Sequence, residues 1–314
     1  MSATSQVPIE DSLLSVVGNT PLLPLHRLSA ACGKASLWAK AEWFNPGGSV
    51  KARPARAILQ QALASQALRG RRLIDATSGN MGIAYATFTA ALGIPLTLAM
   101  PADASPERIA ILQGLGADVV LTRPEQGIDG AMAWVRKQAE SHPDRYFWAN
   151  QYDNPANWRA HYATTGPEIV AQTRGRITHL VAGTGTGGTI MGAGRYLRAH
   201  VPDVQIIGVQ PHPADGGIEG LKHIATARHR PRIYDATFPD AVRHVRLADA
   251  QAMALQLART EGLFVGLSAA AAVWAACELA STLEEGLIVV VLPDAGYKYL
   301  SQAPWRSTPA VASA

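Results

Sequence analysis

The chain has 314 residues, of which 48% are hydrophobic and 17% are charged. This composition excludes a disordered or fibrous protein and predicts a compact one, with two domains or one large α/β unit. The net charge of +4 comes from lysines and arginines spread along the chain. Such a spread favours small anionic ligands over nucleic acid.

Cysteine usage and the apolar runs bear on location. The two cysteines, Cys32 and Cys277, have no metal-ligand spacing and do not suggest a secreted disulfide framework. The first residues, MSATSQVPIEDS, carry no export signal, and runs such as 287–292 are far shorter than the ~20 residues that cross a bilayer. The nine histidines lack paired spacing. We therefore expect a cytoplasmic protein without a membrane span or a metal site.

Short apolar runs alternate with helical patterns along the chain. Strands are predicted at 72–76, 94–99 and 118–122, and helices at 81–92 and 106–115. After residue 175 the rhythm returns, with strands at 177–182, 205–210 and 287–292 and helices near 188–200, 249–261 and 268–280. Strands alternating with helices predict an α/β fold, in which two domains each hold a mainly parallel twisted sheet flanked by helices.

Three segments fall outside this rhythm. The loop 150–158, NQYDNPANW, is dense in Asn and Pro and separates the two rhythms, so it is the predicted boundary. Residues 211–240 carry four of the 20 prolines and are predicted to form a long surface excursion, a kind of segment that is often functional. The tail 303–314, rich in Ala, Pro and Ser, is expected to be disordered.

A glycine-rich loop follows the apolar run at 177–182. In GTGTGG, 183–188, the glycines allow close backbone approach, and the N–H groups and the following helix start can bind phosphate oxygens. A tight turn without a ligand is the alternative. The spacing also fits a dinucleotide-binding loop, but the next strand ends in Gln210 where that fold needs an acid, and no lysine follows as in a P-loop. A phosphate monoester cofactor fits better.

A lysine stands at a predicted helix start. In NPGGSVK, 45–51, Ser49 is a plausible cap and Lys51 falls in the first turn, where the helix dipole favours the neutral amine. A neutral amine can condense with an aldehyde, which is how pyridoxal phosphate is attached. A solvated surface lysine is the alternative.

A second turn of the same kind, TSGNMG at 77–82, opens the helix at 81. Its hydroxyls and free N–H groups can bind a carboxylate. An ordinary capped helix start is the alternative reading.

These segments, in this order, resemble the cysteine synthases, or O-acetylserine sulfhydrylases, of fold-type II pyridoxal-phosphate enzymes, which share a tryptophan synthase β-like fold. The likeness runs from VGNTPL (17–22) through NPGGSVK, TSGNMG, NQYDNPAN, TTGPEI (164–169), GTGTGGT and GLSAA (266–270) to PDAGYKYLS (293–301). The isoform B branch is the most similar. The resemblance implies a smaller substrate-binding domain at 46–150 and a larger cofactor-binding domain made of 1–45 plus 151–302.

The resemblance also implies roles for single residues. Lys51 matches the lysine that carries pyridoxal 5'-phosphate as a Schiff base, and Asn80 the residue that bonds the cofactor's 3-hydroxyl. Ser268 matches the serine facing the pyridine nitrogen. The phosphate loop comprises Gly185, Thr186, Gly187, Gly188 and Thr189, and the substrate carboxylate falls to Thr77, Ser78, Met81 and Gln151.

The implied activity is β-replacement of the acetoxy group of O-acetyl-L-serine by sulfide or thiosulfate, through an α-aminoacrylate, in a homodimer. O-phosphoserine sulfhydrylase and cystathionine β-synthase activities are the alternatives. Lys222 stands where related enzymes carry a basic residue, and would clamp an anionic leaving group or thiosulfate, unless it is a solvated loop lysine. The chain departs from the family at Ala52, at Met81, and at Ala269 and Ala270.

Overall fold

The computed structural model describes residues 12–215 and 217–307. Its strands form two sheets. The four-stranded sheet has the order β5-β4-β3-β6 and is parallel throughout, and the six-stranded sheet has the order β1-β2-β10-β7-β8-β9. Only the β1–β2 pair is antiparallel among the described strands. This confirms the predicted α/β fold with two mainly parallel sheets.

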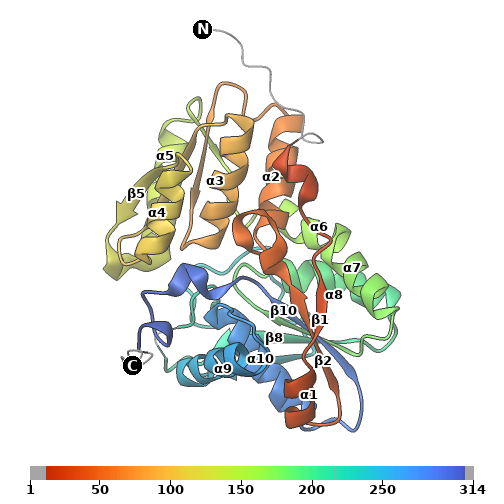
Figure 1. Ribbon diagram of the computed structural model, residues 1–314. Coiled ribbons are helices and arrows are strands. Elements are labelled where there is room, and N and C mark those ends of the chain that lie inside the picture. The colour runs from red at the N-terminus through yellow and green to blue at the C-terminus, as the bar shows by residue number, and fades with distance from the viewer. Residues whose placement is uncertain (1–11, 216, 308–314) are drawn as a thin grey trace.

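The four-stranded sheet and its helices occupy the upper part of Figure 1. Its strands are β3 (Arg72–Ala76), β4 (Leu96–Pro101), β5 (Asp118–Thr122) and β6 (Tyr146–Trp148). The helices are α2 (Ala52–Ala64), α3 (Asn80–Leu92), α4 (Pro106–Gly114) and α5 (Gly127–Ser141). Leu98 packs in the core shared with α2 and α3, while Ala99 faces the core shared with α5. The pleat thus gives β4 two buried faces.

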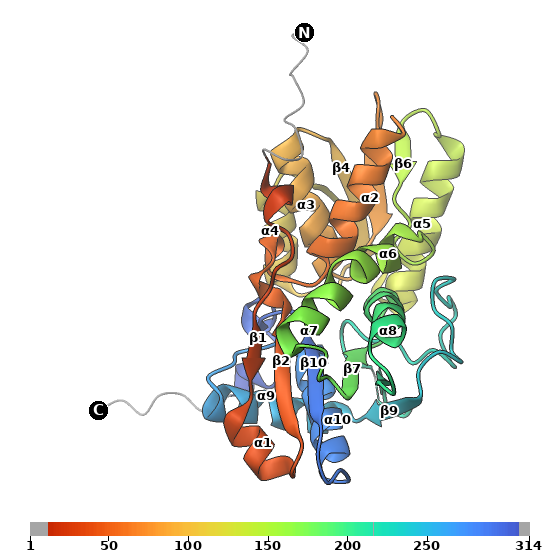
Figure 2. The same ribbon diagram turned by 90° about the vertical axis from the view of Figure 1, so that its right-hand side faces the viewer.

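The six-stranded sheet lies below it in Figure 1. Its strands are β1 (Leu22–Pro24), β2 (Ser36–Ala41), β7 (His179–Gly183), β8 (Gln205–Pro211), β9 (Ala241–Val245) and β10 (Leu287–Leu292). The helices are α1 (His26–Cys32), α6 (Ala156–Ala163), α7 (Thr165–Thr173), α8 (Gly188–His200), α9 (Leu247–Thr260) and α10 (Leu267–Ala280). Figure 2 shows α6 between the two sheets and α7 and α8 below it.

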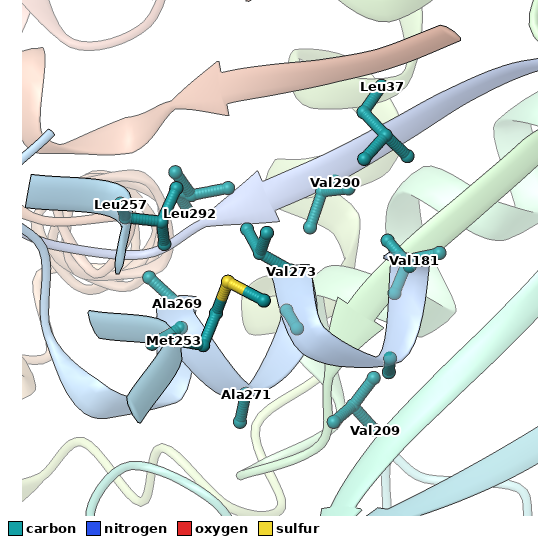
Figure 3. Packing of buried hydrophobic residues seen from close by; sticks show 14 of the residues in the cluster. Leu37, Val181, Val209, Met253, Leu257, Ala269, Ala271, Val273, Val290 and Leu292 are labelled. Carbon is teal, nitrogen blue, oxygen red and sulfur yellow. The ribbon is translucent and has the colours of Figure 1, made fainter. Parts of the chain in front are cut away.

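Helix α10 fits against the six-stranded sheet because its sequence supplies small side chains. Ala269 through Ala272 are fully buried, in one core with side chains from five strands, such as Val181 and Val290. Figure 3 shows Leu37, Val181, Val209 and Val290 gathered around this helix. Close packing fixes the start of α10, and hence Ser268, relative to the strand ends.

The two cysteines form a single disulfide, Cys32–Cys277, which joins α1 to α10 across 245 residues of sequence. The cysteine count argued against a disulfide framework and did not anticipate this one bond. No helix in the described part of the chain has the length and apolarity to span a membrane.

The prediction of a disordered tail from residue 303 onwards is wrong for its first residues. Trp305–Ser307 forms a 3-10 turn, and Trp305 packs with its ring centroid 4.1 Å from that of Phe264. Residues 308–314 lie outside the described residues. The long excursion after β8 contains turns but no helix or strand among its described residues up to β9.

Candidate active site

A cavity of about 530 Å³ opens where strands of both sheets end. Thr77 follows β3, Gly183 ends β7 and Pro293 follows β10, and all three line it. Carboxyl ends of parallel strands are the usual place for ligands in open α/β sheets. Every site residue expected from the sequence lines this cavity: Lys51, Thr77, Ser78, Asn80, Met81, Gln151, Gly185, Thr186, Gly187, Gly188, Thr189, Lys222 and Ser268.

Three helix N-termini meet at the cavity. The helices α3, α8 and α10 have Gly79, Gly187 and Gly266 as N-caps, and none of these caps supplies a side-chain hydrogen bond. In these first turns the Gly82 N–H donates to Thr77 Oγ1 and the Gly188 N–H to Thr186 Oγ1, and each helix dipole places partial positive charge at its start. The site suits a ligand with several anionic groups.

Lys51 stands immediately before helix α2 and lines the cavity. It is the N-cap residue and not part of the first turn, so the sequence placed the helix start slightly too early. Ser49 Oγ accepts the Lys51 N–H at 3.4 Å, and the N-cap itself has no side-chain bond. Burial lowers the pKa of the Lys51 amine, and the nearby Asp294 carboxylate partly opposes this shift. Burial therefore favours the neutral amine more than at a solvated surface lysine.

Asn80 is held by a buried polar network. Its Nδ2 donates to Asp294 Oδ2 at 2.7 Å and to Tyr299 Oη at 3.3 Å, while its Oδ1 accepts from Lys298 Nζ at 2.9 Å. Lys298 Nζ also donates to the carbonyl of Gly47, in the loop before Lys51. The side chain of Asn80 is thus fixed in orientation at the cavity wall.

The turn 77–82 is organised from within. Thr77 Oγ1 accepts the N–H groups of Gly79 at 2.9 Å and Gly82 at 3.0 Å, so the hydroxyl shapes the turn. Gln151 Nε2 donates to the Ala76 carbonyl at 2.8 Å, which places it beside this turn. Met81 is buried, and its thioether stands where the family more often has a hydroxyl.

The glycine-rich loop is braced by Asn157 of α6. Asn157 Nδ2 donates to Thr186 Oγ1 at 3.1 Å and to the Gln151 carbonyl at 2.7 Å. A Cβ on Gly188 would lie 1.9 Å from Asn157 Oδ1, and a Cβ on Gly187, whose φ is +87°, would lie 2.7 Å from the Tyr234 ring. Only glycine leaves this backbone where it is.

Ser268 and Lys222 also line the cavity, and the Lys222 N–H donates to the Thr184 carbonyl in the glycine-rich loop at 2.8 Å. Ser268 is the second residue of α10 and is 5% exposed, with its hydroxyl 3.5 Å from the position of a Cβ on Gly220. Lys222 Nζ lies 4.7 Å from the centre of the Tyr152 ring, and burial lowers the pKa of the Lys222 amine. Lys222 is therefore partly withdrawn from solvent.

Several residues at or next to the cavity had no role predicted from the sequence. Tyr299 lines it, while Asp294 and Lys298 contact Asn80 behind its wall. All three belong to PDAGYKYLS, whose likeness to the family was the only available signal. Arg108 and Glu219 also line the cavity, and no motif marked them. No cluster of three or more metal-ligating side chains occurs in the portion of the chain that the structure describes.

Comparison with known proteins agrees with this geometry. Residues 13–294 match the model of the pyridoxal-phosphate dependent enzyme family. A cysteine synthase of Aquifex aeolicus is 49% identical over 300 residues, covering 93% of this chain and 91% of that protein. Cysteine synthase B of Salmonella typhimurium is 39% identical over 292 residues, with coverage of 93% and 95%.

A solved structure shows the same fold. The O-acetylserine sulfhydrylase isoform 3 of Entamoeba histolytica superposes with a TM-score of 0.87 at 32% identity, covering 99% of this chain and 96% of that one. The match therefore includes both sheets and every wall of the cavity. The chain belongs to the pyridoxal-phosphate-dependent enzymes, in the family of cysteine synthases.

Proposed function

We propose that the chain is a cysteine synthase that uses pyridoxal 5'-phosphate to replace the acetoxy group of O-acetyl-L-serine by sulfide. In the overall reaction the β-carbon loses its bond to the acetate oxygen and gains one to sulfur, so acetate and L-cysteine are the products. The observation that carries the proposal is one cavity that is lined by a lysine with a lowered pKa and by the starts of three helices with glycine N-caps.

The residues present fit the cofactor. The 185–189 backbone before α8 would hold its phosphate, Asn80 its 3-hydroxyl, and Ser268 its pyridine nitrogen, and Lys51 would attach it through Nζ. When bound, pyridoxal phosphate supplies an aldehyde for an amine and an electron-accepting ring that stabilises negative charge at the α-carbon of an amino acid. Because a neutral hydroxyl, and not a carboxylate, would face the ring nitrogen at Ser268, that nitrogen would stay largely unprotonated.

The chain's own groups account for substrate binding and proton movement. The start of α3, with the hydroxyls of Thr77 and Ser78 and the amide of Gln151, would bind the substrate carboxylate. Lys51 Nζ, kept neutral by burial, would accept the proton that leaves the α-carbon and later return it. Closing of the 77–82 turn on the carboxylate would exclude water.

The test is turnover by the purified protein after incubation with pyridoxal phosphate. We expect cysteine from O-acetylserine plus sulfide, and less product from O-phosphoserine or serine. A preference for O-phosphoserine, or product only from serine with homocysteine, would contradict the proposed substrate. No turnover and no spectral change with any amino acid would contradict the activity itself.

We also propose that Lys222 binds the anionic sulfur donor or leaving group. Its amine lies at the cavity wall against Tyr152, within reach of a ligand there. Lys222→Ala should lower kcat/KM for thiosulfate about tenfold while sulfide use changes less, because sulfide needs no clamp for an extended anion. Equal losses with both donors would contradict this role.

A homodimer and a cytoplasmic location are proposed on the family resemblance and on the scarcity of cysteines. The disulfide weighs against a reducing compartment, where such bonds are rare. Light scattering of the purified protein measures the oligomeric state. Thiol alkylation in intact cells tests the location, because both cysteines would be modified in a reducing cytoplasm.

A further inference from the structure

A buried arginine lies behind the 77–82 turn. Arg108 of α4 is 1% exposed, and its Nη1 donates to the Ser78 carbonyl, so the guanidinium bonds the backbone of the turn directly. A Cβ on Gly79 would lie 2.4 Å from Arg108 Cδ. The turn and the arginine therefore pack so closely that neither can move without the other.

The same guanidinium reaches the other sheet. Nη1 also forms an ion pair with Glu219, in the segment that follows β8 of the six-stranded sheet. The Glu219 side chain is 25% exposed and that of Arg108 is 2% exposed. The pair crosses from the four-stranded to the six-stranded side of the cavity, and both residues line it.

Arg108 is held on its remaining sides as well. Nε donates to Ser105 Oγ at 2.9 Å, and Ser105 Oγ donates to the Lys298 carbonyl at 3.0 Å. The guanidinium carbon lies 5.2 Å from the centre of the Tyr299 ring. Nη2, however, is buried without a hydrogen-bond partner. Glu219 is the carboxylate that pairs directly with this buried cation, although Asp294 and Glu107 also act on its charge. Removing Glu219 therefore weakens the compensation of a buried charge.

We propose that Arg108 and Glu219 are positioning residues that hold the 77–82 turn in the conformation that receives the substrate carboxylate. Neither touches the reacting atoms. Arg108 fixes the turn through the Ser78 carbonyl, and Glu219 fixes Arg108 from the opposite wall, so the turn is set by both sheets together. The inference rests on the proposed function, in which this turn binds the carboxylate.

The test compares Glu219→Gln with the wild type and with Glu285→Gln, a control at an exposed glutamate far from the cavity lining. Glu219→Gln should raise KM for O-acetylserine about fivefold to twentyfold, because an unanchored turn must be ordered on binding, while kcat changes less than about threefold. The visible absorption of the bound cofactor should be unchanged. Glu219→Asp should recover part of the loss.

Amide hydrogen exchange provides a readout that does not depend on turnover. In the cofactor-loaded protein without substrate, the amides of residues 79–82 should exchange faster in Glu219→Gln than in the wild type and in Glu285→Gln. Unchanged KM and unchanged exchange would overturn the inference while leaving the proposed function intact. Parallel losses of cofactor absorption, kcat and global stability would also overturn it, since they indicate a general structural role. If O-acetylserine is not a substrate, the proposed function fails and the exchange result alone decides the inference.

Discussion

Asp75 is the second-last residue of strand β3, just before the 77–82 turn, and is 2% exposed. Oδ2 accepts the Gln151 N–H at 3.2 Å, and Oδ1 accepts the Ala76 N–H at 2.9 Å and the Trp148 indole N–H at 3.3 Å. Burial raises the pKa of Asp75 from 3.8 to about 7, although these hydrogen bonds oppose the shift. This carboxyl therefore changes charge near neutral pH, directly under the predicted carboxylate site.

The sign of the effect on stability follows from linkage. Because the folded state holds the Asp75 proton more tightly than the unfolded state, its contribution is full below about pH 4 and is lost as the pH rises to about 7. We expect Asp75→Asn to remove a fall of about 1 kcal/mol per pH unit in the free energy of unfolding between pH 5 and 7. Urea unfolding at several pH values measures it. The same pH dependence in wild type and variant would contradict the assignment.

At this scale the sequence predicted residue types better than their partners. Lys51, Asn80 and Ser268 stand in short motifs, and all three line the cavity. Arg108 and Glu219 are separated by 111 residues, and only the folded chain brings them together. A pair of charges at such a separation leaves no local spacing to detect, so it could not be predicted.

Among the elements, the glycine-rich loop before α8 makes the sharpest prediction. Gly188→Ala would place a methyl group 1.9 Å from Asn157 Oδ1, so Asn157 must move and release Thr186. We expect the dissociation constant for pyridoxal phosphate to rise at least about tenfold, because the N–H groups at a helix start bind phosphate only when they point at its oxygens. Absorption titration of the apoprotein measures this constant. Gly114→Ala, whose Cβ meets nothing within 4 Å, is the matched control. Equal affinities in the two variants would contradict the cradle.

Element boundaries were predicted where the apolar pattern was continuous. The strands at 72–76, 118–122 and 287–292 begin and end as predicted. The first and the last are buried along nearly their whole length, whereas 118–122 is a partly exposed edge strand whose short apolar run still marks it. Helix α5 and strands β2 and β9 were not predicted. Strand β9 lies at a sheet edge, its sequence AVRHV has no regular alternation of polar and apolar residues, and two of its five residues are exposed, which leaves a weak signal.

At the scale of the whole molecule, a buried charge network joins the N-terminal strands to the helix that follows Lys51. Glu168 of α7 accepts from Arg53 Nη1 at 2.7 Å and from Lys40 Nζ at 2.6 Å, and Arg53 Nε donates to Glu42 at 2.7 Å. The side chains of Lys40, Glu42 and Arg53 are fully buried, and that of Glu168 is 13% exposed. The start of α2 is thereby fixed to segments more than 100 residues away.

This network predicts a defined acid sensitivity. The bonds from Arg53 and Lys40 outweigh burial and lower the pKa of Glu168 from 4.5 to about 2. Its stabilisation is therefore full above about pH 4.5 and is lost as the pH falls towards 2. Glu168→Gln should lower the free energy of unfolding by about 3 kcal/mol at pH 7, and the difference should shrink below pH 4. A pH-independent difference in chemical unfolding would contradict this. Glu285→Gln serves as the exposed control.

The division of the chain at residues 46 and 150 remains a prediction, although the four-stranded sheet uses residues 72–148 and the six-stranded sheet residues 22–41 and 179–292. The sequence could suggest two sheets because each repeats strand and helix. It could not show that β1 and β2 join β10, since that pairing links residues about 250 positions apart.

The most direct test of the account is the site of covalent cofactor attachment. The protein loaded with pyridoxal phosphate is reduced with borohydride, digested, and searched by mass spectrometry for the modified lysine. We predict modification of Lys51, because its amine lies at the cavity and burial lowers its pKa. The Lys51→Ala variant should show neither a visible absorption band nor a label. A label on Lys222 or Lys298 in the wild type, or no label at all, would contradict the account.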